Sequence, residues 1–317
     1  MTRVAVVGVG HFGREHARIY SESGRAELVA VCDTSEPSGR EVAERYGTAY
    51  VPDFRELIGK VEAVSLAAPT VAHHEIACEL LAAGIAVLIE KPISRTLEEA
   101  DEIISLAERH NAVLQVGHLE RFNPAVVAAG RILTKPLFFE AHRLSVFTPR
   151  SLDIDVVMDL MIHDLDVILS MVGSEAAEIR AAGVPILTPR IDIANARIEF
   201  ENGCVANLTA SRVSGERVRK VRFFQPSEYV SVDYAAQEAS VVAVRPGPEG
   251  RPEFSSRLLP VERDEPLRLE IESFLASVRG GEVKTSGRDG RRALALALGI
   301  TEKIREHAQR AGVPFIG

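Results

Sequence analysis

The chain has 317 residues, of which 46% are hydrophobic and 26% are charged, so it is long enough to form two domains with substantial cores. Its formal charge of -8 and the lack of a run rich in lysine and arginine argue against a nucleic-acid surface, because phosphate backbones need a concentrated positive patch. Cys32, Cys78 and Cys204 lie far apart without metal-ligand spacing, which favours buried thiols in a reducing compartment. Because the first residues already read as a strand, and no apolar run reaches membrane-spanning length, we expect a cytoplasmic protein with no membrane partner.

The chain starts with a pattern typical of dinucleotide-binding folds. Val4–Val7 reads as a buried strand, and Gly8, Gly10 and Gly13 follow it before a helix pattern over Arg14–Ser21. In such a turn the first glycine makes the tight bend, the second lets the backbone approach a pyrophosphate, and the third allows close helix packing. Glycines in an ordinary hairpin are the alternative, which the order of strand, glycine turn and helix disfavours.

A second strand pattern, Leu28–Val31, leads to Asp33, which lies 20 residues beyond Gly13. An acid at this distance accepts a hydrogen bond from a ribose hydroxyl and repels a 2′-phosphate, so we predict NAD rather than NADP. His11 and Phe12 lie inside the glycine motif and belong to the same expected cofactor site.

Strand and helix patterns then alternate, which indicates a doubly wound parallel sheet. Cofactor and substrate should lie beyond the carboxyl ends of its strands. The predicted elements are strands at Ala63–Ala67, Ile85–Ile89 and Val113–Val116, and helices at His74–Ala83 and Leu97–Arg109.

Two loops follow the carboxyl ends of predicted strands, at Pro69–His73 and at Glu90–Pro92. Lys91 in the second loop could bind the cofactor, orient a hydroxyl or transfer a proton. A lysine on the protein surface is an equally good interpretation of this position without further context.

The pattern changes beyond Lys135 to extended runs, which indicate an antiparallel sheet. Glu201–Gly203 is a turn signal between two of these runs, as a hairpin requires. One face of such a sheet can cover helices, while the other meets solvent or another subunit. The runs are Leu137–Phe147, Ile191–Phe200, Val205–Val213, Val218–Phe224, Tyr229–Tyr234 and Ser240–Val244, followed by helix patterns at Arg268–Val278 and Gly290–Ala308.

The segment Val156–Leu169 places Asp159, His163 and Asp166 at helical spacing among apolar residues. An imidazole titrates near neutrality, and a carboxylate one turn before it holds its tautomer, so His163 is a reasonable proton acceptor. The alternative is a helix that buries its apolar face while its acids cap and solvate it. Acid-base chemistry of this kind requires no metal.

The segment AAGIAVLIEKPIS around Lys91, the glycine motif and the later Asp159-x3-His163-x2-Asp166 resemble the Gfo/Idh/MocA oxidoreductase family. The resemblance implies a Rossmann domain over residues 1–120, and a mixed, largely antiparallel open-sheet domain over residues 121–317 that binds substrate and forms homodimers or homotetramers. The active site would lie at their junction, and the C-terminal helices would pack near it.

The same resemblance implies roles for matching positions. Lys91 corresponds to the catalytic or substrate-orienting lysine, His163 to the catalytic histidine and Asp159 to its acidic partner. Glu90 and Lys91 also belong to the cofactor side, as do Pro69 and His73, which match a Pro-x3-His pattern. The family often has a cis bond where this chain has Lys91–Pro92, although X-Pro bonds are usually trans.

Many members of the family carry glycines where this chain has Asp155, Val156 and Met161, which weakens the analogy with inositol-type members. Gly117–Val126 and Asp155–Ile168 instead resemble the subgroup that contains UDP-N-acetylglucosamine 3-dehydrogenases. This resemblance implies oxidation of a sugar C3 hydroxyl to a ketone, which precedes transamination in some lipid A pathways.

A UDP-sugar carries two phosphate charges, and guanidinium groups recognise phosphate oxygens in pairs. Arg121, Arg143 and Arg212 are therefore candidates for substrate binding, and Asn123 for contacts to sugar hydroxyls. For Arg143 and Arg212 a solvent-exposed sheet position is an equally good interpretation. Glu120 could orient a sugar group or pair with an arginine.

Two other functions remain open at this stage. One is a dehydrogenase for another sugar, an inositol or another nucleotide sugar on the same scaffold. The other is an NAD-sensing regulatory protein without turnover, because fold alone does not establish catalysis. Lys91, Asp159 and His163 argue for the enzyme, since neither a sensor nor a protein-binding module requires them.

Overall fold

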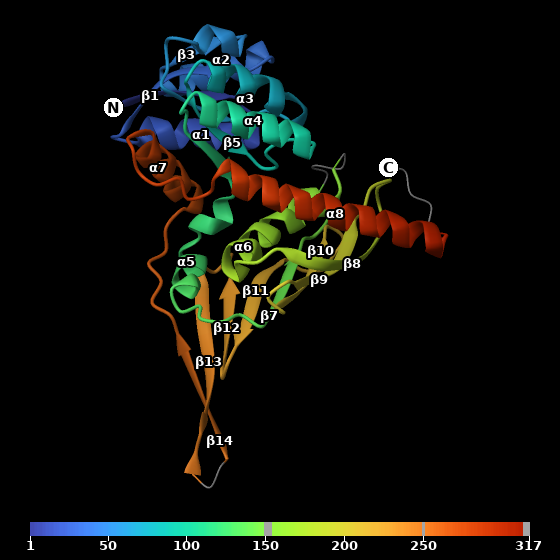
Figure 1. Cartoon of the computed structure of the whole chain (residues 1–317). Coiled ribbons are helices and arrows are strands. Elements are labelled where there is room, and N and C mark those ends of the chain that lie inside the picture. Colours follow the sequence, from blue (N-terminus) through green and yellow to red (C-terminus); the bar gives the residue numbers. More distant parts are fainter. Residues whose placement is uncertain (149–153, 249–250, 313–317) are drawn as a thin grey trace. The chain divides into compact units, whose positions relative to one another are not determined.

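The computed structural model describes residues 1–148, 154–248 and 251–312 and divides into two compact units (Figure 1). Unit 1 comprises Met1–Leu119 and Glu265–Leu294, and unit 2 comprises Glu120–Asp264 and the chain from Ala295 onward. The first break lies next to the expected boundary at residue 120. Glu265–Leu294, expected in the second domain, instead contributes to unit 1.

Unit 1 contains a six-stranded parallel sheet with the order β3-β2-β1-β4-β5-β6, which confirms the predicted doubly wound architecture. The strand order reverses between β1 and β4, and ligands of such sheets bind beyond the carboxyl ends of the strands at this point. The strands are β1 (Thr2–Val7), β2 (Ala26–Cys32), β3 (Ala49–Val51), β4 (Ala63–Leu66), β5 (Ala86–Glu90) and β6 (Leu114–Gly117).

Helices and short turns connect these strands. Because both faces of a parallel sheet are covered, its strands are apolar runs, and all residues of β4 and β5 are buried. The helices are α1 (His11–Glu22), α2 (Glu36–Tyr46), α3 (His73–Ala82) and α4 (Leu97–Arg109), with the 3-10 turns η1 (Phe54–Leu57), η2 (Thr70–Ala72) and η3 (Leu119–Phe122).

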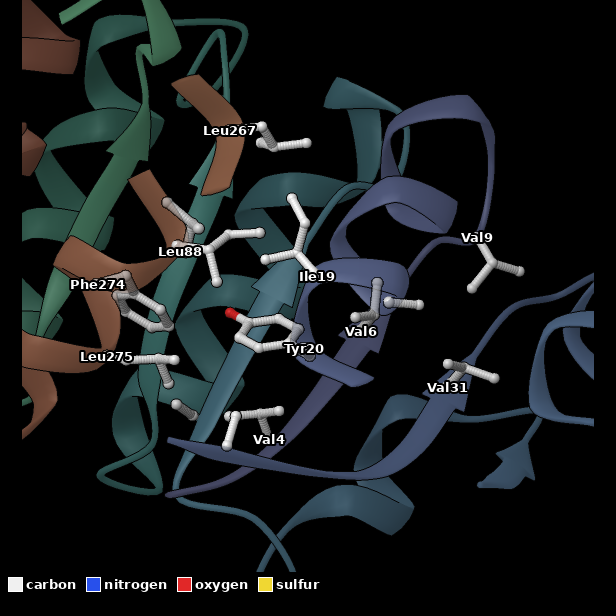
Figure 2. Packing of buried hydrophobic residues seen from close by; sticks show 14 of the residues in the cluster. Val4, Val6, Val9, Ile19, Tyr20, Val31, Leu88, Leu267, Phe274 and Leu275 are labelled. Atoms are coloured by element: carbon white, nitrogen blue, oxygen red, sulfur yellow. The ribbon is translucent and has the colours of Figure 1, made fainter. Parts of the chain in front are cut away.

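The return of the chain to unit 1 follows from the apolar face of α7 (Pro266–Val278). Phe274 and Leu275 of α7 belong to the same buried cluster as Tyr20 of α1 and Leu88 of β5 (Figure 2). Burial of a large aromatic side chain contributes about 1.5–3 kcal/mol, so this helix stabilises the sheet it covers. α8 (Gly287–Ala311) supplies residues to both units.

Unit 2 contains an eight-stranded sheet with the order β14-β13-β12-β11-β7-β10-β9-β8. β7 and β10 are parallel and the other neighbours are antiparallel, which confirms the predicted mixed, largely antiparallel sheet. The strands are β7 (Phe138–Leu144), β8 (Ala176–Val184), β9 (Ile193–Phe200), β10 (Val205–Ser211), β11 (Val218–Gln225), β12 (Glu228–Asp233), β13 (Glu238–Pro246) and β14 (Pro252–Leu258).

The hairpin between β9 and β10 turns where the sequence predicts it. Gly203 has φ +83°, a conformation that favours glycine, and its N–H donates to the carbonyl oxygen of Phe200 over 2.9 Å. Unit 2 also contains α5 (Pro124–Gly130), a π turn η4 (Val157–Met161) and α6 (Ile162–Val172). Among the described residues, we find no helix with the length and apolar character that crossing a membrane demands.

Candidate functional site

The loop between β1 and α1 carries three glycines with different surroundings. Gly8 has φ +86°, and a Cβ there would lie 2.5 Å from the backbone nitrogen of Ala68, so a larger residue is both strained and blocked. A Cβ on Gly13 would lie 1.8 Å from the carbonyl oxygen of Gly8, so the loop packs directly on α1. At Gly10 nothing lies within 4 Å of the Cβ position. A ligand can therefore approach the backbone at Gly10.

Gly10 is also the N-cap of α1, and among the described residues no side chain caps it and no acid lies in the first turn. The first N–H groups of a helix lack partners within the helix, and its dipole favours negative charge there. His11 and Phe12 in this turn are exposed, with their ring centroids 5.8 Å apart. The turn is therefore suited to a diphosphate.

Asp33 follows β2 and contacts the glycine loop. Its Oδ2 accepts a hydrogen bond of 2.8 Å from the N–H of Val9, and its Oδ1 accepts one of 2.8 Å from the N–H of Ser35. Each carboxylate oxygen has a second acceptor site, and the residue is only half-buried. Asp33 thus lies beside the glycine loop and retains capacity to accept from a ribose hydroxyl.

His73 joins the loops that follow β4 and β5. Its Nδ1 lies 3.0 Å from the carbonyl oxygen of Pro92, and its Nε2 lies 2.8 Å from that of Ala68. Burial lowers the pKa of this 1% exposed imidazole, although only the protonated form can donate to both oxygens. Because both ring nitrogens face protein carbonyls, we assign His73 a positioning role instead of the expected cofactor contact. Pro69 is exposed at the start of the first loop.

Lys91 is half-buried directly after β5, and its bond to Pro92 is cis. The preceding Glu90 is 8% exposed, and its Oε1 lies 3.0 Å from Nε2 of the fully buried His16 on α1. A Cβ on Gly117 would lie 3.0 Å from the Glu90 carboxylate. The structure therefore fixes Glu90 between α1 and β6, which limits the motion of the backbone that carries Lys91.

The segment with the predicted proton acceptor begins with Asp155, whose Oδ1 accepts from the N–H groups of Val157 and Met158 over 2.9 and 3.0 Å. Asp159 lies in the π turn η4, and His163 lies in the first turn of α6. The sequence predicts one regular helix here, so the π turn is a correction. Asp159 and His163 are both half-buried, and π turns are frequent at functional sites.

Arg143 on β7 lies in a buried ion-pair cluster. It donates to both oxygens of Asp164, over 2.8 and 3.0 Å, and to Oε1 of Glu120 over 3.0 Å. Its guanidinium also lies 5.0 Å from the ring centroid of Tyr234. Burial lowers the pKa of Arg143, but Asp164 and Glu120 outweigh this effect and raise it, so the side chain stays charged.

Asp164 follows His163 directly in α6, so the bidentate contact from Arg143 fixes the helix turn that carries the candidate proton acceptor. Arg143 is 3% exposed. We therefore assign it a positioning role instead of the expected substrate contact. Of the two predictions for Glu120, pairing with an arginine is confirmed.

Arg212 has a similar environment. Its Nη2 donates to the carbonyl oxygen of Ile154, and its Nε lies 3.8 Å from Oδ1 of Asp192. Burial raises the pKa of Asp192, but hydrogen bonds from the backbone of residues 186–188 and from the Thr188 hydroxyl outweigh this and lower it. Arg212 thus anchors the backbone just before the π turn, and we assign it a positioning role as well.

Asn123 and Arg121 are the remaining predicted substrate contacts. The amide oxygen of Asn123 accepts from the N–H of Ala125, which caps α5, and its Nδ2 donates to the carbonyl oxygen of Tyr234 over 3.0 Å. Asn123 is 2% exposed, so its amide forms hydrogen bonds within the protein and is not accessible to a ligand. The Arg121 side chain is 19% exposed, with Nη1 3.5 Å from Asp166. Among these four residues, Arg121 has the most accessible side chain.

Sequence reasoning missed His16, Asp164, Asp192 and Tyr234, which hold the predicted residues in place. The alternating pattern of β7 could have indicated that Arg143 is buried, because Arg143 shares a sheet face with the buried Phe139 and Ala141. An arginine on an apolar face needs a carboxylate partner, and Asp164 lies in the neighbouring apolar helix.

Protein-family models match segments of both units. A family model described as an oxidoreductase family with an NAD-binding Rossmann fold matches residues 2–118. A second model, described as the GFO/IDH/MocA C-terminal domain, matches residues 135–224.

Individual known proteins are similar to this chain over almost its full length. UDP-N-acetylglucosamine 3-dehydrogenase of Acidithiobacillus ferrooxidans is 38% identical over 311 residues, which cover 97% of this chain and 99% of that protein. A solved structure of this enzyme has a TM-score of 0.90 at 37% identity and covers 96% of this chain and 98% of that one. Myo-inositol 2-dehydrogenase of Thermotoga maritima is 27% identical over 96% of both chains.

Proposed function

Because this chain belongs to the Gfo/Idh/MocA oxidoreductase family, we propose that it oxidises the C3 hydroxyl of UDP-N-acetylglucosamine to a ketone with NAD. The observation that carries this proposal is the similarity to UDP-N-acetylglucosamine 3-dehydrogenase over nearly the full length of both chains. The product, a UDP-3-keto sugar, is a substrate for transamination in the synthesis of an amino sugar.

The features of unit 1 support NAD as the cofactor. Open space at Gly10 and the uncapped start of α1 fit the diphosphate, and the capacity of Asp33 to accept hydrogen bonds fits a ribose with free hydroxyls. The negative charge of Asp33 disfavours the 2′-phosphate of NADP. When bound, NAD supplies the acceptor for the hydride that leaves the sugar carbon.

The proposed chemistry of the protein itself is the transfer and stabilisation of charge at the sugar hydroxyl. His163 accepts the hydroxyl proton, and Asp159 supports the imidazole as its acidic partner. Lys91 orients the hydroxyl and stabilises the negative charge that develops on its oxygen. Their partial exposure is compatible with contact to a substrate.

We assign recognition of the substrate and assembly of a homo-oligomer to unit 2. Arg121 is the proposed phosphate contact because its guanidinium is the most accessible of the three candidate arginines. The other three candidates act indirectly. Arg143 holds the turn that carries His163, Arg212 the segment before Asp159, and Asn123 the turn that carries Arg121.

The experiment incubates stoichiometric protein with excess NAD and a panel of UDP-sugars and inositols, and measures NADH absorbance and product mass. Loss of two hydrogens from UDP-N-acetylglucosamine alone is the expected result. Stoichiometric protein reveals a single turnover even where NADH stays bound. Oxidation of an inositol instead, the compound in the name of the Thermotoga relative, contradicts the proposed substrate. NAD binding without any oxidation favours a regulatory protein.

Two variants test the proposed roles in the same assay. We expect His163→Asn to bind NAD normally and to lose about 10²–10⁴-fold in turnover, which is the usual contribution of acid-base catalysis. We expect Lys91→Ala to lose about 10²–10³-fold in turnover, which is the usual contribution of one group that stabilises a developing negative charge. A near-normal rate in either variant removes that residue from the chemical step.

A further inference from the structure

We propose that unit 1 carries a second, separate site, a zinc-type divalent metal site formed by His74 and Cys78 of α3 and Glu102 of α4. One ligand atom from each residue lies within 4.8 Å of the other two. The three atoms offer nitrogen, sulfur and oxygen to a single ion. Zinc accepts this donor set because it is a borderline-soft ion that binds histidine, cysteine and carboxylate ligands.

The helical geometry brings these side chains together. His74 and Cys78 are four residues apart on α3, so they lie on one helix face on adjacent turns. α4 lies beside α3 (Figure 1), and Oε2 of Glu102 lies 2.9 Å from Nε2 of His74. The set therefore spans two helices, and an ion bound there links α3 to α4.

The distances fit a site that closes around an ion with small side-chain movements. Zinc bonds of about 2.0–2.3 Å in tetrahedral geometry separate the ligand atoms by about 3.3–3.7 Å. The His74–Glu102 contact must open slightly from 2.9 Å, and the longest separation must contract from at most 4.8 Å. Three protein ligands leave the fourth position to water or to another ligand.

The surroundings leave the site accessible without exposing the thiol fully. The side chains of His74 and Glu102 are 32% and 58% exposed, and Cys78 is half-buried. Burial, together with Glu102 and Glu99, raises the pKa of Cys78 to about 11, so a metal must displace the thiol proton when it binds. Glu99 receives hydrogen bonds from Arg95, which leaves Glu102 as the carboxylate in contact with His74.

The proposed metal site uses none of the residues proposed for catalysis and does not include the neighbouring His73. His73, the neighbour of His74, is 1% exposed and contacts the carbonyl oxygens of Ala68 and Pro92. His74 is much more exposed and contacts α4 instead. Two consecutive histidines thus have different tasks, and substitution of His74 leaves the contacts of His73 in place.

The test titrates the full-length protein, first stripped of metal by a chelator, with Zn²⁺ against a chromophoric chelator and with Co²⁺ as a spectroscopic probe. We expect one Zn²⁺ per chain and a thiolate-to-cobalt charge-transfer band. Cys78→Ser should abolish the band, and Cys78→Ser, His74→Gln and Glu102→Gln should each weaken zinc binding at least about 10-fold, because each removes one of three ligands. Thermal unfolding without metal checks that each variant is folded.

The matched control is Cys204→Ser, which removes a buried thiol of unit 2 and should leave stoichiometry and band unchanged. Zinc binding that survives Cys78→Ser and His74→Gln at full affinity places the metal elsewhere and overturns the proposal. A cobalt complex without the charge-transfer band, or no saturable binding at all, overturns it as well.

Discussion

Asp33 has two roles, a hydrogen bond to the glycine loop and a negative charge near the proposed ribose, and one substitution can separate them. Its carboxylate holds the glycine loop through the N–H of Val9, and its negative charge is the proposed basis for discrimination against a 2′-phosphate. Asparagine keeps an acceptor oxygen but not the charge. Since hydrogen bonds to charged groups contribute about 1.5–3 kcal/mol, we expect Asp33→Asn to lower the ratio of kcat/KM for NAD to that for NADP by about 10–100-fold. An unchanged ratio in steady-state assays contradicts the ribose role.

His73 should give stability a measurable dependence on pH. Burial lowers its pKa below the value of about 6.5 in an unfolded chain. As the pH falls below about 6.5, the unfolded chain gains a proton that the folded protein does not, so His73 lowers the free energy of unfolding by up to about 1.4 kcal/mol per pH unit.

Urea unfolding between about pH 7.5 and about pH 5.5 checks this prediction. The loss of stability toward low pH should be smaller in His73→Gln than in the unsubstituted protein. His110→Gln, at the exposed end of α4, is the control and should leave the slope unchanged. Equal slopes in His73→Gln and the unsubstituted protein refute the assignment.

At the scale of single elements, substitutions in the loop before α1 can test cofactor binding and folding separately. Gly10 has φ -65° and open space at its Cβ position, so alanine fits the fold but its methyl group occupies the place proposed for the diphosphate. We expect Gly10→Ala to keep the melting temperature and to weaken NAD binding at least about 10-fold, which equals about 1.4 kcal/mol. Isothermal titration calorimetry measures NAD binding, and thermal unfolding measures stability.

Gly8→Ala is the contrasting variant. Its positive φ and the backbone of Ala68 at 2.5 Å leave no room for a methyl group, so the melting temperature should fall together with NAD binding. If Gly10→Ala binds NAD as the unsubstituted protein does, the diphosphate does not lie at this loop.

The ion pairs of β7 allow a similar comparison. Arg143 pairs with Asp164 in the interior, whereas Glu140 of the same strand pairs with the partly exposed Arg222 of β11. Loss of one partner from a buried pair costs about 3–5 kcal/mol because the other charge stays buried, and loss of an exposed pair costs about 0–1 kcal/mol. We therefore expect Arg143→Met to be far more destabilising than Arg222→Met in urea unfolding. Similar costs for the two variants contradict the buried ion pair between Arg143 and Asp164.

The predictability of individual elements followed the strength of their sequence patterns. Leu97–Arg109 has strong helical periodicity and the Thr96 cap, and α4 has these same bounds. α2 contains Pro37 and Gly39, and the edge strand β14 is exposed throughout, so neither shows a clear apolar period. α5 has seven residues, too few for a helical period, and β8 lacks clean alternation.

The same physics explains which site residues could be placed from sequence. Gly8, Gly13 and Asp33 occupy a local motif with fixed backbone geometry, so spacing alone predicts that they meet. Arg143, Arg212 and His73 contact Asp164, Asp192 and the backbone of Pro92, but no sequence motif fixes the spacing of these pairs. Tertiary contacts of this kind decide between a positioning role and ligand binding, and no local pattern encodes them.

At the scale of the whole molecule, the chain leaves unit 1 near residue 120 and returns to it at Glu265. The patterns of β1 to β6 fit one parallel sheet, and the later strands fit a second, mixed sheet. The helix pattern of α7 gives its amphipathic character but not the sheet it covers, since the apolar face of a helix is compatible with either core. The return to unit 1 therefore required the structure.

The most direct test of the central claim follows one atom. Stoichiometric protein and NAD are incubated with UDP-N-acetylglucosamine that carries deuterium at C3, and the reduced cofactor and the sugar are analysed by mass spectrometry. The proposed reaction predicts one deuterium in NADH and none left at the oxidised carbon of the UDP-sugar. NADH without deuterium, together with a keto sugar that retains it, shows oxidation at another carbon and contradicts the assignment of C3.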